Sequence, residues 1–207
     1  MKSNNIIYFY ENNVIVRFND NIYYLKLNEN ILNNGIILNK DKFIKEYNEF
    51  IKENKLKKII NNKMVVIIQS NISVNDIKML SIIFEELGIK IIKIIKDITL
   101  LNVRKNKAYL IGDNNLRLYF INKYNKKVTV NMNTSQISYN DIISIIQNHI
   151  KESLFILSSN DDLINKLLKN KSYYLINNYI KFIFDEIGKY LSYKVNTPIN
   201  VDFCISI

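Results

Sequence analysis

The run Met64-Val65-Val66-Ile67-Ile68 decides the fold of this chain, because it is a continuous apolar stretch of strand length. Such a run is typical of a strand that is buried on both faces of a sheet. The sequence Ser73-Val74-Asn75-Asp76 follows it and has the form of a capping box, which predicts the start of a helix. Gly88 stands where a left-handed helix end is expected, and residues 91–95 have the composition of the next strand. Strand, helix and strand at this spacing predict a parallel βαβ unit.

Upstream of this unit the sequence predicts an antiparallel meander, because three β-branched and aromatic runs alternate with turns rich in Asn and Asp. The three runs cover residues 6–10, 14–18 and 22–27. Another turn, Asn33-Asn34-Gly35, precedes the apolar residues 36–38. Residues 41–53 carry aromatic residues and Ile at the spacing of one helical face, which predicts a helix.

The second half of the sequence repeats this order of elements. Its expected strands cover residues 108–111, 116–121, 127–131, 154–157 and 172–175, and its expected helices cover residues 139–150, 161–169 and 177–191. Ser138-Tyr139-Asn140-Asp141 is a second capping box ahead of the first of these helices, and Pro198 precedes a strand-like segment at residues 199–205. The repeat predicts an α/β protein of two ribonuclease-H-like lobes, residues 1–104 and 105–207, each with a three-strand meander plus parallel strands and helices.

The chain has 207 residues, of which 48% are hydrophobic, so it is long enough for one sizeable domain or two compact lobes. Its most apolar stretch, residues 88–101, is interrupted by three lysines and is too short to span a bilayer. Residues 1–5 lead into strand-like sequence without a signal-peptide pattern, so we expect a cytoplasmic protein with no transmembrane segment. A single cysteine, Cys204, and a single histidine, His149, exclude an intramolecular disulfide and a histidine-rich metal site.

The formal net charge of +10 raises the question of a polyanionic partner. Only three of the basic residues are arginine, however, and arginine is the side chain that best recognises phosphate and guanine. Ile, Asn and Lys dominate the composition, as expected for a protein encoded in an A/T-rich genome. A nucleic-acid partner therefore stays open but is not favoured.

Several segments, taken in order, match the pattern of a known family. They are residues 33–40 with the helix that follows, 64–70, 73–88, 108–115, 154–164 and 177–191. This order resembles the bacterial actin-like proteins of the MreB, FtsA and PilM type, in the actin–Hsp70–sugar kinase superfamily. The resemblance spans most of the chain and implies a minimal actin-like fold. It also implies that residues 108–115 and 154–164 correspond to the second phosphate loop and the adenosine-binding segment of that family.

The segments that would hold a nucleotide depart from the family pattern. Backbone N–H groups approach phosphate closely where glycine leaves room, and a carboxylate places Mg²⁺. In the first hairpin, residues 8–13 carry neither the Asp nor the Gly of the family pattern. In the second hairpin Leu110 stands at the Asp position, Gly112 remains, and Asp113 and Asn114 replace two glycines.

The third turn departs in the same way, because Ser159 and Asn160 replace its paired glycines. The degenerate cleft positions are therefore Gly112, Asp113, Asn114, Ser159 and Asn160. With these replacements we expect no catalytic residue, no cofactor and no metal site, and an ATP site that has been lost.

Other residues with reactive groups have simpler interpretations. His149 is expected at the C-terminal end of a helix, where it caps the helix or faces solvent, and Cys204 is expected to be a small core residue. Adjacent residues on a helix point about 100° apart, so neither Glu85-Glu86 nor Asp161-Asp162 converges on one metal ion.

Together these observations favour a non-catalytic actin-like scaffold or adaptor that acts through self-assembly or a protein partner. Such a protein would serve a bacterial cytoskeleton, cell division, pilus machinery or plasmid segregation. One alternative is a nucleotide-binding actin-like switch with divergent phosphate loops. Another is a basic module that binds nucleic acid through lysine clusters such as Lys55, Lys57 and Lys58.

Overall fold

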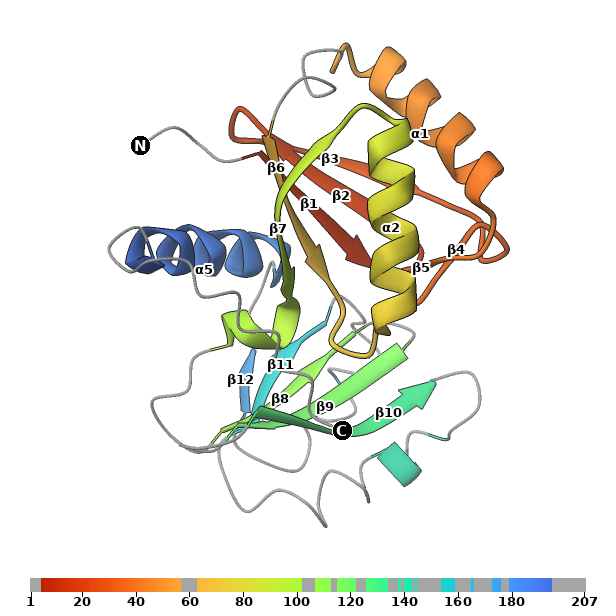
Figure 1. Cartoon of the computed structure of the whole chain (residues 1–207). Helices are drawn as coiled ribbons and strands as arrows, with labels where there is room; N and C mark the ends of the chain where they lie inside the picture. Colours follow the sequence, from red (N-terminus) through yellow and green to blue (C-terminus); the bar gives the residue numbers. More distant parts are fainter. Residues whose placement is uncertain are drawn as a thin grey trace.

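Two five-stranded sheets organise the chain (Figure 1). The computed structural model describes residues 5–56, 63–101, 107–112, 115–121, 126–133, 138, 140–142, 144, 154–158, 165, 173–175 and 179–194. The first sheet has the order β3-β2-β1-β6-β7, and the second has the equivalent order β10-β9-β8-β11-β12. Each combines a three-strand antiparallel meander with two parallel strands, so the predicted α/β class is confirmed. The predicted division at residues 104 and 105 lies outside the described residues and stays a prediction.

The first sheet follows the predicted pattern closely. Its strands are β1 (Asn5–Tyr10), β2 (Asn13–Phe18), β3 (Asn21–Lys26), β6 (Lys63–Ile68) and β7 (Lys90–Lys96). The β2–β3 hairpin turns through Asn19 and Asp20, whose φ angles of 48° and 65° are typical of a two-residue turn that matches strand twist. β6 pairs in parallel with both β1 and β7, so the apolar run that decides the fold is an internal strand.

Helix α1 (Lys40–Glu53) follows a small hairpin made of β4 (Leu32–Asn33) and β5 (Ile36–Ile37). Helix α2 (Val74–Glu86) follows strand β6. The predicted capping box of α2 is confirmed, because Asp76 N–H donates to Ser73 Oγ and Ser73 N–H donates to Asp76 Oδ2, both at 3.2 Å. The helix is followed by Leu87 and then by Gly88, which has a φ of 68°. The N–H of Ile89 then donates to the carbonyl of Phe84 at 2.8 Å, the bond expected of a glycine-terminated helix.

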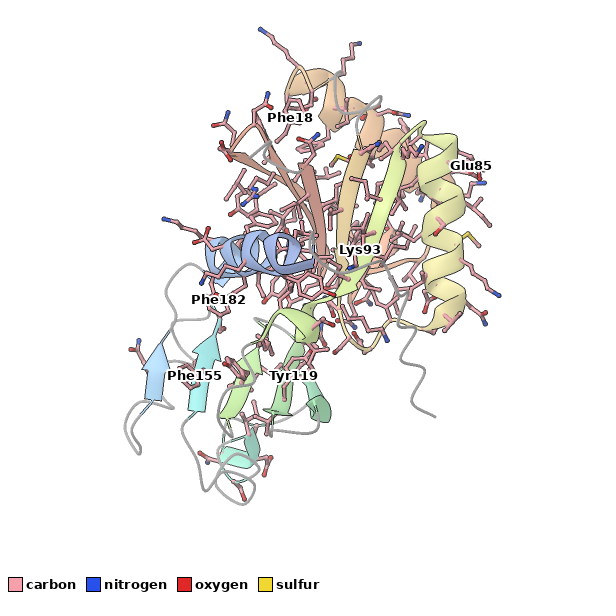
Figure 2. All side chains as sticks on the ribbon, turned by 60° about the vertical axis from the view of Figure 1, so that its left-hand side comes forward. Phe18, Glu85, Lys93, Tyr119, Phe155 and Phe182 are labelled. Carbon is pink, nitrogen blue, oxygen red and sulfur yellow. The ribbon has the colours of Figure 1, made fainter. Side chains whose placement is uncertain are left out.

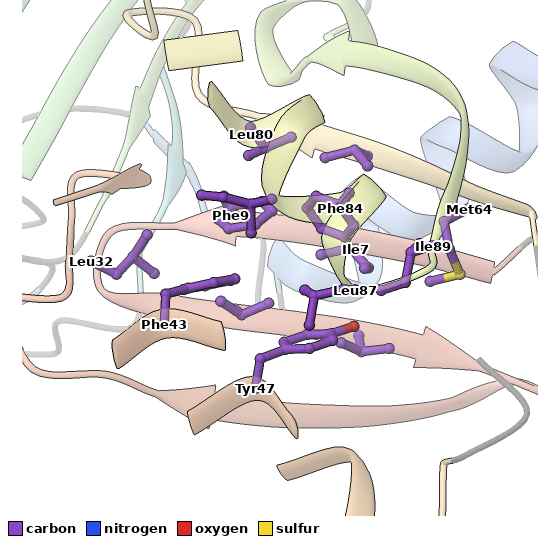
Figure 3. Packing of buried hydrophobic residues seen from close by; sticks show 14 of the residues in the cluster. Ile7, Phe9, Leu32, Phe43, Tyr47, Met64, Leu80, Phe84, Leu87 and Ile89 are labelled. Atoms are coloured by element: carbon purple, nitrogen blue, oxygen red, sulfur yellow. The ribbon is translucent and has the colours of Figure 1, made fainter. Parts of the chain in front are cut away.

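One face of the first sheet is buried by α1 and α2. Phe9 of β1 lies 6.0 Å, centroid to centroid, from Phe43 of α1 and 6.0 Å from Phe84 of α2. Phe43 also stacks on Tyr47 at 5.8 Å, and Figure 3 shows these rings gathered over the strands. Because all these side chains are almost fully buried, they form the main core of the first half.

The opposite face of the same sheet is buried by α5 (Tyr179–Lys194), which comes from the far end of the described chain (Figure 1). Ile183, Phe184 and Ile187 are almost fully buried, together with Ile6 and Tyr8 of β1. The helix predicted over residues 177–191 is therefore present as Tyr179–Lys194, with one apolar face buried. Its packing on the first sheet was not indicated by the sequence pattern.

Two basic side chains of the first sheet hold α5 at separate points. Arg17 Nη1 donates to the carbonyl of Phe184 at 3.2 Å, and its guanidinium lies 5.5 Å from the centre of the Phe184 ring. Lys93 of β7 lies 4.9 Å from the centre of the Tyr190 ring. Figure 2 shows Lys93 on the strand that passes this helix.

The second sheet repeats the first in topology. Its strands are β8 (Lys107–Ile111), β9 (Asn115–Ile121), β10 (Lys126–Asn133), β11 (Leu154–Leu157) and β12 (Tyr173–Leu175). At the second capping box Asp141 N–H donates to Ser138 Oγ at 3.3 Å. Most of the predicted helices over residues 139–150 and 161–169, and all of residues 199–205, lie outside the described residues. Among the described residues, no helix is both long and apolar enough to cross a membrane.

The end of α1 gives a test of local backbone conformation. Lys55 has a φ of 56°, and the N–H of Leu56 donates to the carbonyl of Ile51 at 2.8 Å, so α1 ends as α2 does but without glycine. We expect Lys55→Gly to raise the free energy of unfolding by about 0.5–1 kcal/mol, because glycine adopts this conformation without strain. Chemical denaturation followed by circular dichroism measures the change.

The matched control is Lys45→Gly, which removes the same charge from an exposed position inside α1. It should lower the free energy of unfolding by about 0.5–1 kcal/mol, because glycine weakens a helix interior. Destabilisation by Lys55→Gly as well would contradict this account of the α1 end.

Candidate functional site between the two sheets

Two hairpin turns, one from each sheet, are joined by the side chain of Glu11. Glu11 lies in the β1–β2 turn and is only 3% exposed. Its Oε1 accepts a hydrogen bond from the N–H of Asn115, the first residue of β9, at 3.1 Å. These are the two turns that the family resemblance assigns to phosphate binding. A carboxylate of this chain therefore binds a backbone N–H of the second turn.

The backbone of Glu11 is held in place by the segments around it. Its φ is 51°, and its carbonyl accepts from Gly35 N–H at 2.7 Å. The Gln69 side-chain amide is oriented so that both its oxygen and its nitrogen have partners. The amide oxygen accepts from Glu11 N–H at 2.6 Å, and the amide nitrogen donates to the Asn34 carbonyl at 3.3 Å. This left-handed conformation is uncommon for a residue with a side chain, and the surrounding hydrogen bonds stabilise it.

Gly112 serves the geometry of the second turn. Its φ is 131°, and a Cβ atom at this position would lie 2.2 Å from the carbonyl oxygen of Asn115. No side chain fits there, which explains the glycine without a ligand. Leu110, at the position of the family carboxylate, is fully buried in the core. The other predicted cleft positions, Asp113, Asn114, Ser159 and Asn160, lie outside the described residues.

A buried ion pair lies at the same junction of the two sheets. Arg117 Nη1 of β9 donates to Asp97 Oδ2 at 2.6 Å, and the two side chains are 2% and 0% exposed. Asp97 opens the short helix η2 (Asp97–Leu100), which leaves the first sheet after β7. The pair therefore ties the connection between the two halves to a strand of the second sheet.

Tyrosine hydroxyls surround this ion pair. Tyr8 Oη donates to Asp97 Oδ2 at 3.3 Å, and Arg117 Nη1 also donates to Tyr119 Oη at 3.0 Å. Tyr119 Oη lies 2.7 Å from Ser70 Oγ, at the end of the strand β6. Figure 2 shows Tyr119 on the second sheet, near its junction with the first. The network thus joins β1, β6, η2 and β9.

Electrostatics keep the network in one protonation state near neutral pH. Burial alone lowers the pKa of Arg117, but the charge of Asp97 and the neighbouring tyrosines outweigh it and raise that pKa well above its ordinary value. Burial, and then the charge of Asp97, raises the pKa of both Tyr8 and Tyr119. The guanidinium is therefore charged and the hydroxyls are neutral, so neither tyrosine is a general base at neutral pH.

Sequence reasoning did not single out Glu11, Asp97 or Arg117. Arginine was one available signal, because the chain has only three and a strand that buries one must neutralise it. Within the described ranges, no group of three or more His, Cys, Asp or Glu side chains could hold a metal ion. Glu85 is exposed on α2, and Glu86 pairs with Lys40, which agrees with the expected surface role. His149, Cys204 and the pair Asp161-Asp162 lie outside the described residues.

Comparison with known proteins places the fold. No protein-family model and no curated protein matches the sequence. Among solved structures, the ethanolamine utilization protein EutJ from Carboxydothermus hydrogenoformans is similar with a TM-score of 0.58 and 8% identity, over 83% of this chain and 84% of that one. EutJ has an actin-like fold of the actin–Hsp70–sugar kinase superfamily, so the predicted actin-like fold is confirmed.

Two further similarities are weaker. MreB5 of Spiroplasma citri bound to ADP gives a TM-score of 0.48 and 11% identity, over 72% of this chain and 58% of that one. The PPX-GPPA enzyme of Aquifex aeolicus gives a TM-score of 0.34 and 10% identity, over 73% of this chain and 66% of that one. The present chain thus spans a little over half the length of MreB5.

The buried ion pair is tested by removing one charge at constant size. We expect Asp97→Asn to lower the free energy of unfolding by about 3 kcal/mol, because the Arg117 charge is then buried without its counterion. The matched control is Glu86→Gln in the Lys40–Glu86 pair, whose side chains are 37% and 44% exposed. It should cost about 0–1 kcal/mol, since water screens an exposed pair. Equal losses in urea denaturation would contradict the structural role of the Asp97–Arg117 pair.

The buried tyrosines predict a loss of stability in alkaline solution. Burial, and then the negative charge of Glu186, raises the pKa of Tyr109 to about 12, and burial also raises the pKa of Tyr8, Tyr47 and Tyr119. In the unfolded chain these hydroxyls titrate near pH ~10. Above that pH the folded protein holds more protons than the unfolded chain, so the free energy of unfolding falls as the pH rises from about 10 to 12.

Urea denaturation at intervals across this pH range measures the loss, and tyrosinate absorbance reports the titration. A constant free energy of unfolding through the range would contradict the burial of these hydroxyls.

Proposed function

We propose that this chain is a non-catalytic actin-like scaffold or adaptor of the bacterial cytoplasm, which acts by self-assembly or by binding a protein partner. The observation that carries the proposal is the hydrogen bond from Asn115 N–H to the Glu11 carboxylate. In an actin-like cleft, backbone N–H groups of these two turns are the groups that bind phosphate. In this chain the Glu11 carboxylate accepts a hydrogen bond from one of these N–H groups, that of Asn115.

The charge of Glu11 also opposes phosphate. Two like charges about 4 Å apart repel by roughly 4 kcal/mol near a protein surface. Glu11 is buried, and its carbonyl accepts a hydrogen bond from Gly35 N–H, so the carboxylate is held in the turn. A triphosphate entering between the turns would meet this charge and would have to displace the carboxylate from Asn115.

The two halves are joined by side chains of the chain itself. The Asp97–Arg117 pair connects η2 to β9, and α5 covers the first sheet through Phe184. In nucleotide-switched proteins, the ligand supplies the differential interactions that close one domain on another. This chain makes contacts between its two halves with its own side chains, which suits a constitutive scaffold.

Calorimetric titration with Mg-ATP and Mg-ADP, up to millimolar concentration, tests the proposal. We expect no saturable heat and no rise in the thermal unfolding temperature, because a ligand that does not bind the folded state cannot stabilise it. Saturable binding at one site, or ATP hydrolysis with a defined turnover, would overturn the proposal.

One variant and its control test whether the Glu11 side chain joins the two turns. Glu11→Ala should lower the free energy of unfolding by about 1–2 kcal/mol, since it leaves the half-buried N–H of Asn115 without its acceptor. Glu29→Ala, at an exposed position after β3, is the matched control and should change stability by less than about 0.5 kcal/mol. If the two variants are equally stable, the Glu11 contact does not join the turns.

A nucleotide-binding actin-like switch is the second candidate, and one observation favours it. Nε and Nη2 of Arg117 are buried and form no hydrogen bond with any described residue. Such donors suit an anion or a water molecule. One-site binding of Mg-ATP that weakens in Arg117→Lys, which keeps a positive charge beside Asp97 but lacks Nε and Nη2, would support this function. The third candidate, a nucleic-acid-binding module, requires binding that weakens steeply with salt; Lys57 and Lys58 lie outside the described residues.

A further inference from the structure

The outer edge of β3 is an unprotected sheet edge. β3 pairs with β2 one to one over all six residues, without a bulge, and no described strand pairs along its other side. The strand contains no proline and one charged residue, Lys26. Tyr24 is 58% exposed. Long regular edges with few charges are the edges to which another strand is added most readily.

The hairpin geometry shows which peptide groups are available. The two-residue turn makes Phe18 and Asn21 a hydrogen-bonded pair, and Leu27 N–H donates to Asn12 O at 2.8 Å in the same alternation. The residues between them alternate, so the N–H and C=O groups of Ile22, Tyr24 and Lys26 are directed away from β2. The peptide groups of these three alternate residues are thus available for pairing with another strand.

The opposite edge of the same sheet is protected. β7 carries Lys90, Lys93 and Lys96, and a register shift opposite Met64 and Val65 leaves Ile92 as an extra, bulged residue. In an antiparallel pair of two β7 strands centred on Lys93, that lysine would face its own copy and Lys90 would face Lys96. Bulges and lysines are the devices by which natural edges avoid pairing. The two edges therefore differ in kind.

We propose that β3 is a self-association edge that binds β3 of a second copy of this chain in antiparallel fashion. This proposal rests on the proposed scaffold function and adds to it the surface and the partner through which the chain would self-assemble. A two-fold axis at Tyr24 places Tyr24 opposite Tyr24 of the second copy and Ile22 opposite Lys26 of the second copy. No like charges meet in this register, in contrast to β7.

Charge complementarity supports a second copy as the occupant. Asp20 lies in the turn two residues before Ile22, so this register brings it to the end of β3 that faces Lys26 of the second copy. The two-fold axis generates this opposite-charge contact twice. Asp20 and Lys26 are both exposed in the single chain and thus accessible to such a contact. The strand is therefore self-complementary in both its peptide groups and its charges.

Sedimentation equilibrium of the full chain, without nucleotide and over a concentration series in about 0.15 M salt, tests the proposal. The wild-type chain should form a dimer, and Tyr24→Lys should shift it to monomer because two lysines then face each other on the axis. Ile92→Lys on the β7 edge is the matched control and should leave the dimer unchanged. A wild-type monomer at every concentration, or a dimer that tolerates Tyr24→Lys, overturns the proposal.

A charge-exchange cycle tests the register independently of Tyr24. Lys26→Glu alone should raise the dimer dissociation constant by about tenfold, because it converts two attractive contacts with Asp20 into repulsive ones. Adding Asp20→Lys to that variant should restore most of the affinity. Failure of the double variant to recover, with a far-ultraviolet spectrum like that of the wild type, overturns the register.

These outcomes are distinct from those that concern the nucleotide. A monomer that binds no Mg-ATP overturns the self-association edge alone. A dimer that binds and hydrolyses Mg-ATP overturns the proposed non-catalytic function alone.

Discussion

The first sheet carries apolar side chains on both faces, and both must be removed from water. Ile7 and Phe9 of β1 point to one face, and Ile6 and Tyr8 point to the other. Local sequence supplies α1 and α2 for the first face. The second face is covered by α5, a helix more than 160 residues further along the chain (Figure 1). This requirement joins the two halves of the molecule, and the candidate site depends on that junction.

Once the halves are joined, polar groups at the junction need partners. Arg117 is 2% exposed and Asp97 is 0% exposed, and a buried charge without a counterion would be strongly destabilising. Tyr8, Tyr119 and Ser70 complete the network with groups from the strands of both sheets. At the neighbouring turns, the Glu11 carboxylate accepts a hydrogen bond from the N–H of Asn115, the first residue of β9. Side chains of both halves therefore join the two sheets.

An actin-like fold does not by itself specify a function, because function depends on the groups in the cleft. The described residues of these two hairpins include a leucine buried in β8, a glycine where a side chain would not fit and a glutamate that binds a backbone N–H of the other sheet. Each of these has a structural explanation that does not involve a nucleotide. The β3 and β7 edges of the first sheet differ as well, because β3 pairs regularly along its length whereas β7 carries a bulge and three lysines.

Elements that depend on neighbouring residues follow from the sequence alone: the strands of the two five-stranded sheets, α1, α2, the capping box of α2, the Ser138–Asp141 contact and the glycine after α2. The sequence also indicated the actin-like order of the elements, because that order is a property of the chain. Only the tertiary structure decided that α5 covers the first sheet, that Asp97 pairs with Arg117 and that Glu11 reaches Asn115. The last two contacts join residues 20 and 104 positions apart, and no periodicity or cap reports such pairs. Their partners are set by which polar groups become buried together when the two sheets meet, and that is a property of the folded chain.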